Sequence, residues 1–243
     1  MEGGQAVSAS DYSINEFQQL GPLILYHGRE CNRRNTYMVT YNFYKNIIYS
    51  MPLVCISWYS GWSGQTIYDI YLLQVYNVFF TCFPIIIYAV YDQEFRKSEL
   101  LDRPRLYIRG MRQNYLSWGK YFLAIGEAVI HGFKIFVVAY IYFDYALSDN
   151  GRNNDMRSDG NLCYACVIIA VTFKILFDSN TINALVVLGS LLSIAAYFIF
   201  VYVMGLFVEL DIFDQLQEFA RFKQVYFVMF LAGFAAVPFK KFY

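Results

Sequence analysis

Six stretches of the chain are apolar enough to be read as membrane-spanning helices. Residues 46–68, 70–91 and 179–208 contain no charged side chain, and each run reaches the roughly 20 residues that cross a hydrocarbon layer about 30 Å thick. Three further stretches are shorter or contain a few charges. We expect an all-α membrane protein with six transmembrane helices, at about 37–60, 70–91, 118–145, 162–178, 183–208 and 223–240.

The composition supports a membrane protein and the distribution of charge orients it. Apolar residues make up 58% of the chain and charged residues only 16%, against roughly 25% in an average soluble domain. With six spans, four Lys and Arg residues fall on one side, and twelve fall on the other, which is therefore expected to be cytosolic together with both termini. The twelve are Arg29, Arg33, Arg34, Arg96, Lys97, Arg103, Arg105, Arg109, Arg112, Lys120, Lys240 and Lys241.

Several classes of function find no support in the sequence. No basic stripe is interleaved with aromatic residues outside the spans, which disfavours nucleic acid as a partner. The histidines lack the spacing of a zinc site, no catalytic residues are indicated, and no cofactor or metal is expected on this chain. Cys163 and Cys166 have the spacing of a redox or metal pair, but near the start of a membrane helix they are more simply read as small packing residues.

Lys45 is the most informative residue of the first span. The nearest acidic residues in sequence are Glu30 and Asp69, so no local carboxylate neutralises it. A lone ammonium inside a bilayer costs roughly 2.5 to 3.5 kcal/mol on insertion scales and is tolerated where it faces a protein interior or a polar pathway. Lys45 is therefore a candidate transport residue.

Polar residues form a stripe on each of the first two spans. Asn42, Asn46, Ser50 and Ser57 share one side of the first helix, bordered by Lys45, and Gln74, Asn77, Thr81 and Tyr88 share one side of the second. The short Gly-rich connection from Gly61 to Thr66 makes the two helices antiparallel neighbours, so that the stripes can meet. Such stripes either join helices by hydrogen bonds or form a groove for a charged or zwitterionic group, and Lys45 favours the groove.

Prolines and charges modify three of the spans. Pro52 and Pro84 leave the carbonyls of Ile48 and Phe80 free to bend the helix or to bind a neighbour. In the third span Glu127, His131 and Lys134 share one face. They are read either as a polar network within the helix or as a proton relay or second gate.

A series of short motifs also resembles one known family. The chain contains, in this order, Glu2-Gly3-Gly4-Gln5-Ala6-Val7, Ser10-Asp11-Tyr12-Ser13-Ile14, Leu25-Tyr26-His27-Gly28-Arg29, Phe43-Tyr44-Lys45-Asn46, Gly61-Trp62-Ser63-Gly64-Gln65-Thr66, Tyr76-Asn77 with Thr81 and Pro84, and Tyr91-Asp92-Gln93-Glu94. These resemble the motifs of the C-terminal membrane region of eukaryotic phospholipid-transporting P-type ATPases, the lipid flippases. The likeness extends over essentially the whole chain.

The resemblance implies a fold, an activity and a site. The spans would correspond to helices five to ten of a P-type ATPase, with residues 1–35 ending the phosphorylation domain and leading into a membrane domain over 36–243. The implied activity is ATP-driven movement of phospholipid from the exoplasmic to the cytoplasmic leaflet, with Lys45, Asn46 and Asn77 on the headgroup path; the polar stripe adds Thr81. An ion pump is disfavoured because neither of the first two spans contains an acidic residue within its apolar run.

The resemblance also implies partners. ATP and magnesium would act in a full-length pump, because the phosphorylation and nucleotide-binding motifs are not found in this chain. We expect a missing N-terminal pump portion and a two-span glycoprotein accessory subunit, in either the plasma membrane or an endomembrane such as Golgi or endosome. The alternative is a freestanding, non-pumping membrane protein that acts through helix and partner interactions.

Overall fold

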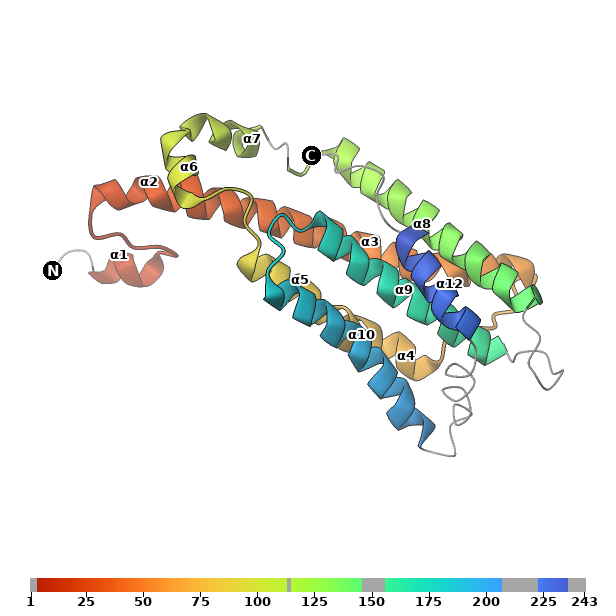
Figure 1. Ribbon diagram of the computed structural model, residues 1–243. Helices are drawn as coiled ribbons and strands as arrows, with labels where there is room; N and C mark the ends of the chain where they lie inside the picture. The colour runs from red at the N-terminus through yellow and green to blue at the C-terminus, as the bar shows by residue number, and fades with distance from the viewer. Residues whose placement is uncertain (1–3, 113–114, 146–155, 207–222, 236–243) are drawn as a thin grey trace.

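The computed structural model describes residues 4–112, 115–145, 156–206 and 223–235 (Figure 1). No strand occurs in this part of the chain, so the expected all-α class is confirmed for it. The helices are α1 (Gly4–Ala9), η1 (Phe17–Gln19), α2 (Leu20–Pro22), η2 (Leu23–Gly28), α3 (Arg29–Tyr59), α4 (Ile70–Val75), η3 (Tyr76–Phe80), α5 (Cys82–Tyr91), α6 (Lys97–Asp102), η4 (Pro104–Tyr107), α7 (Ile108–Met111), α8 (Trp118–Tyr145), α9 (Met156–Asp178), α10 (Ala184–Gly205) and α12 (Lys223–Ala235).

Four helical stretches among the described residues are long and apolar enough to cross a membrane: Ile70–Tyr91, Trp118–Ile141, Asp159–Asp178 and Ala184–Gly205. Helix α3 has 31 residues, a length of about 46 Å, but the polar residues at its centre keep it out of this set. Helix α3 also begins at Arg29, eight residues before the expected span at 37–60. The helical segment η2, which ends at Gly28, leads directly into it. The described part of α12 is 13 residues long.

Helix α9 forms the centre of the bundle. Figure 1 shows α3 and α8 side by side, α10 along α5, and α12 against α8 and α9. The most apolar window of α9 is 72% buried, against about a third or less for the other three stretches. Cys163 and Cys166 lie fully buried in this helix as free thiols, which agrees with their interpretation as packing residues.

The connection after α3 reverses the chain as expected. Helix α3 and the broken helix α4–η3–α5 run in opposite directions side by side (Figure 1). Gly61 and Gly64 have φ angles of 63° and 77°, in the left-handed region that glycine adopts without a steric penalty. Trp62 between them has a φ of 61°, which is uncommon for a side chain of this size. The two glycines therefore permit the tight turn that makes the helices neighbours.

Tyrosine hydroxyls satisfy backbone carbonyls inside this bundle. The hydroxyl of Tyr164 donates to the carbonyl of Leu72 at 2.7 Å, and that of Tyr197 donates to the carbonyl of Asn161 at 2.9 Å. Both rings are buried, and they stack on each other with centroids 5.6 Å apart. A tyrosine combines a large apolar ring with one donor, so it can fill the core and bind a carbonyl that a membrane helix leaves exposed.

Two glycines of α8, Gly126 and Gly132, allow a test of how closely α3 and α8 pack. A Cβ atom built at Gly132 would lie 2.5 Å from the Cβ of Met51 and 3.1 Å from the carbonyl oxygen of Ile48, whereas one at Gly126 would meet nothing within 4 Å. We predict that Gly132→Ala destabilises the fold by about 1 to 3 kcal/mol through overpacking. Gly126→Ala is expected to leave stability unchanged or to raise it by up to about 1 kcal/mol. Thermal unfolding of both variants in the same detergent checks this, and equal midpoints would contradict the proposed close approach.

Candidate functional site

The second predicted span breaks at Thr81. Pro84 has no backbone N–H, so the carbonyl of Phe80 receives no helical hydrogen bond. The π-helix η3 ends there, Thr81 takes φ −122° and ψ −3°, and α5 begins at the next residue. The hydroxyl of Ser193 on α10 donates to the Phe80 carbonyl. The expectation that a neighbouring group would bind this carbonyl is therefore confirmed.

Lys45 binds the helix break. Its Nζ donates to Oγ1 of Thr81 at 3.0 Å, and that hydroxyl in turn donates to the carbonyl of Tyr76 at 3.1 Å. The hydroxyl of Tyr76 donates to the carbonyl of Lys45 at 2.9 Å. These three bonds close a ring between α3 and the broken helix. The Lys45 side chain forms one arm of this ring, and the residue is only 5% exposed.

The charge of Lys45 is not neutralised within the described part of the chain. No carboxylate there lies within ion-pair distance of its amine, and the bonded partner is a neutral hydroxyl. A buried ammonium in such surroundings is unfavourable unless a negative group approaches it. An ammonium carries three donor hydrogens, so donors beyond the bond to Thr81 remain to bind an anion.

The two polar stripes are expected to meet between the helices, but their amide side chains do not lie there. Lys45 and Thr81 come together, but Asn46 and Asn77 are exposed on the outside of the bundle. Asn42, Ser50 and Gln74 are exposed as well. Tyr88 is instead buried near the loop end of the bundle, where its hydroxyl accepts a hydrogen bond from Arg33 at 3.3 Å. The second stripe thus divides into a buried part and an exposed part, whereas in the first stripe only the bordering Lys45 is buried.

The polar residues of the third span have partners on other helices. Oε2 of Glu127 accepts a hydrogen bond from Nζ of Lys174 on α9 at 3.1 Å. Nδ1 of His131 lies 2.8 Å from the hydroxyl of Tyr44 on α3. Lys134 is half-buried one turn further along α8. These contacts run between helices, and the expected network within α8 stays a prediction.

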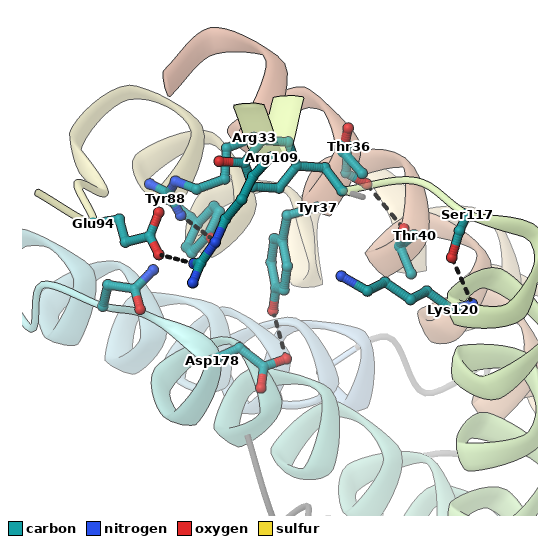
Figure 2. Close-up of a pocket in the computed structure, with 12 residues that line it drawn as sticks. Arg33, Thr36, Tyr37, Thr40, Tyr88, Glu94, Arg109, Ser117, Lys120 and Asp178 are labelled. Carbon is teal, nitrogen blue, oxygen red and sulfur yellow. Dashed lines mark hydrogen bonds and ion pairs between the residues drawn. The ribbon is translucent and has the colours of Figure 1, made fainter. Parts of the chain in front are cut away.

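A polar cavity of about 540 Å³ opens where α3, α8 and α9 meet the loops (Figure 2). Figure 2 shows Tyr37 near its centre, with Lys120 on one side and Glu94 and Arg109 on the other. No motif or periodic pattern predicts this cavity, because its walls come from segments far apart in the chain. The lining residues are Arg33, Thr36, Tyr37, Thr40, Tyr88, Glu94, Arg109, Tyr115, Ser117, Lys120, Asp178 and Asn180.

Asp92 is the buried anchor beside this cavity. Its carboxylate accepts hydrogen bonds from Arg33 at 2.8 Å, from the backbone N–H of Asn180 at 2.8 Å and from that of Thr181 at 3.0 Å. Burial alone would raise the pKa of Asp92, but the Thr181 N–H, the Arg33 guanidinium and the Asn180 N–H outweigh it and lower the pKa below its ordinary value. Asp92 thereby joins the end of α5 to α3 and to the α9–α10 connection.

Comparison with known proteins gives one family over nearly the whole chain. Residues 7–243 match the family described as "Phospholipid-translocating P-type ATPase C-terminal". The chain is 32% identical over 206 residues to phospholipid-transporting ATPase tat-1 of Caenorhabditis elegans, which covers 84% of this chain and 18% of that protein. It is 34% identical over 176 residues to probable phospholipid-transporting ATPase 5 of Arabidopsis thaliana, covering 72% of this chain and 14% of that protein.

A human relative gives the same result. The chain is 32% identical over 213 residues to phospholipid-transporting ATPase ID of Homo sapiens, covering 85% of this chain and 17% of that protein. The chain thus spans less than a fifth of the length of each of these three relatives.

Asp92 generates a prediction on stability and its pH dependence. Because its pKa is lowered in the folded state, its contribution is present above the ordinary carboxyl pKa of about 3.9 and is lost as the pH falls through the folded value. We predict that Asp92→Asn lowers the free energy of unfolding by about 3 kcal/mol at neutral pH, since Arg33 loses a buried partner. The variant should also lose less stability than the unsubstituted chain on acidification below about pH 4.

Chemical unfolding in detergent at neutral and acidic pH measures both effects. The exposed Asp102 on α6 gives the matched control, since Asp102→Asn removes the same charge without a buried partner. If Asp102→Asn and Asp92→Asn lowered stability equally, the anchoring role of Asp92 would be wrong.

Proposed function

Because the chain belongs to the family of phospholipid-translocating P-type ATPase C-terminal regions, we propose that it supplies the second half of the membrane domain of a phospholipid pump, with Lys45 and Thr81 on the path of the lipid headgroup. The observation that carries this proposal is the buried Lys45 amine whose bonded partner is the neutral Thr81 hydroxyl.

The chemistry of this pair suits a phosphate. Every phospholipid headgroup carries a phosphodiester anion, which an ammonium and a hydroxyl can bind together through short, charge-assisted hydrogen bonds. Approach of the phosphate would offset the unfavourable burial of the Lys45 charge, so headgroup and lysine favour each other inside the membrane. The backbone at the Thr81 break is non-helical, which membrane proteins tolerate where it is buried in protein or lines a cavity.

Asn46 and Asn77 would extend the path along the outside of the described bundle. Each directly follows a residue of the Lys45 ring in sequence, namely Lys45 itself and Tyr76. Exposed amides on a membrane helix are unfavourable against acyl chains, so we propose that this face is covered by the remaining helices of the pump. The headgroup would then pass between that cover and α3, with amide groups donating to it before and after Lys45.

We place both termini in the cytosol and assign six spans to the chain. The assignment takes α3 and α12 as the first and last spans beside the four apolar stretches. It puts the polar cavity, Asp92 and most of the basic residues on the cytosolic side. Lipid would move from the exoplasmic to the cytoplasmic leaflet, in the plasma membrane or an endomembrane, with a two-span glycoprotein subunit as partner.

ATP and magnesium act elsewhere in this scheme. No group of three or more His, Cys, Asp or Glu side chains that could hold a metal ion occurs in the described part of the chain. We propose that ATP and magnesium act in the rest of a full-length pump, while the residues of this chain bind and orient the lipid.

Removing the Lys45 charge tests the path. In a complete pump assembled with this membrane half, we predict that Lys45→Met lowers the kcat/KM of lipid-stimulated ATP hydrolysis at least about tenfold, or about 1.4 kcal/mol of transition-state binding. Lys97→Met on α6 is the control, since Lys97 is exposed and far along the chain from the helix break. Unchanged lipid stimulation in Lys45→Met would overturn the assignment.

The two amides should have a smaller and different effect. We predict that Asn46→Ala and Asn77→Ala raise the KM for lipid by about threefold to tenfold with kcat largely kept, because each removes one neutral hydrogen bond of about 0.5 to 1.5 kcal/mol. Asn35→Ala, an exposed amide of the α3 lead-in, is the matched control. A fall in kcat without a change in KM would instead indicate that the amides pack helices.

The orientation has its own test. With an epitope tag at each end, both tags should react with antibody only after intact cells are permeabilised. Exactly one tag reactive in intact cells would require an odd number of spans, and both reactive would reverse the orientation.

A further inference from the structure

A second charged centre lies between α8 and α9, next to α3. Nζ of Lys174 on α9 lies 3.1 Å from Oε2 of Glu127 on α8 and 3.4 Å from Oδ2 of Asp178 on α9. The same amine lies 5.4 Å from the ring centroid of Tyr44. We call Glu127, Lys174 and Asp178 the Lys174 cluster. The proposed headgroup path does not use it.

The Lys174 cluster contains one more carboxylate than ammonium. With all three groups ionised it carries a net negative charge in a position where Lys174 is 12% and Asp178 only 5% exposed in their side chains. Two carboxylates that share one cation in a low-dielectric site favour the uptake of a proton by one of them. A further positive charge is therefore needed to balance the net negative charge of the cluster.

Among the residues that the structure describes, the surrounding helices offer no second fixed cation in contact with the carboxylates. The side chains that face the cluster from α3 are the neutral phenols Tyr37, Tyr41 and Tyr44. The imidazole of His131 on α8 is hydrogen-bonded to Tyr44. Lys134 lies seven residues beyond Glu127, about 10 Å along the helix axis. The described side chains of α12 are uncharged.

The basic residues that line the polar cavity either lie near carboxylates other than Asp178 or are exposed to solvent. Arg33 pairs with Glu30 and Asp92, and Arg109 lies 3.8 Å from Glu94. Lys120 is exposed at the cavity, where solvent screens its charge. None of these three is in ion-pair contact with Asp178.

The polar cavity gives the cluster access to water. Asp178 lines the cavity, and the hydroxyl of Tyr37, near its centre, donates to Oδ2 of Asp178 at 3.0 Å (Figure 2). Lys174 reaches the same oxygen, which leaves Oδ1 as the atom to carry a proton. Asp178 is also more buried than Glu127, whose side chain is 27% exposed, and it lies further from the ammonium.

We propose that the Lys174 cluster is a proton-binding site, in which Asp178 takes up one proton from the polar cavity. The step is a simple protonation: a hydronium ion in the polar cavity gives its proton to Oδ1 and leaves a water molecule, so that the net negative charge of the cluster is removed. With the orientation proposed above, the proton comes from the cytosol.

Proton uptake by the cluster would change the electrostatic field at α3. Lys174 lies over the ring of Tyr44, which directly precedes Lys45 in the chain. The charge state of the cluster therefore acts on the helix that carries the proposed lipid-binding amine. The site needs neither lipid nor ATP to bind its proton.

Infrared difference spectroscopy of the full chain in lipid nanodiscs, across about pH 5 to 8, tests the proposal directly. The unsubstituted chain should show the C=O stretch of a protonated, buried carboxylic acid that disappears as the pH rises. Asp178→Asn should abolish this band. Asp102→Asn, which removes an exposed aspartate, should leave it in place.

Two further variants separate charge balance from a general loss of structure. Glu127→Gln leaves one carboxylate for one ammonium, so Asp178 should stay ionised and the band should be lost. Lys174→Met leaves two carboxylates without a cation, so the band should grow to about twice its amplitude. Helical circular dichroism checks that each variant is folded.

The absence of a titrating band in the unsubstituted chain would overturn the proposal, as would a band that survives Asp178→Asn or fails to grow in Lys174→Met. None of these outcomes bears on the lipid path, because the measurement contains no nucleotide and does not involve Lys45.

Discussion

The structure around the candidate site depends on the need to satisfy every backbone carbonyl inside a membrane. Pro84 removes one donor and so frees the carbonyl of Phe80, and no bulk water is present there to replace it. The hydroxyl of Ser193 binds that carbonyl, while Thr81 binds the carbonyl of Tyr76. The break in the helix is thus fixed by α10 on one side and open to α3 on the other, which is where Lys45 enters.

Much of the fold follows from the apolar pattern, because length and composition decide whether a helix can cross a bilayer. The stretches at 70–91, 118–145 and 183–208 coincide closely with helices, and the glycines at 61 and 64 place α3 beside the broken helix. The start of α3 could not be predicted, since its polar first turns owe their helical form to the buried contacts of Arg29 and Arg33 with distant carboxylates.

The candidate site could be predicted only in part from the sequence. Lys45 stands out in the sequence because its charge is isolated, and Thr81 because it belongs to the polar stripe of the second span. A helical wheel shows which residues share a side but not which side meets a neighbour, so it joined Asn46 and Asn77 to a buried groove although both are exposed. The partners Tyr76, Ser193 and Lys174 depend on which helices pack together, and that arises only in the folded bundle.

Helix α3 connects the three polar centres of the molecule. Arg29 and Arg33 at its start bind acidic residues near the polar cavity, Tyr44 contacts the Lys174 cluster, and Lys45 binds the break. From Arg29 to Lys45 is about 24 Å of helix, and its proline, Pro52, lies beyond this stretch. The contacts at the loop end, at the Lys174 cluster and at the break are therefore all made by one unbroken stretch of helix, so their positions relative to one another are fixed by the helix geometry.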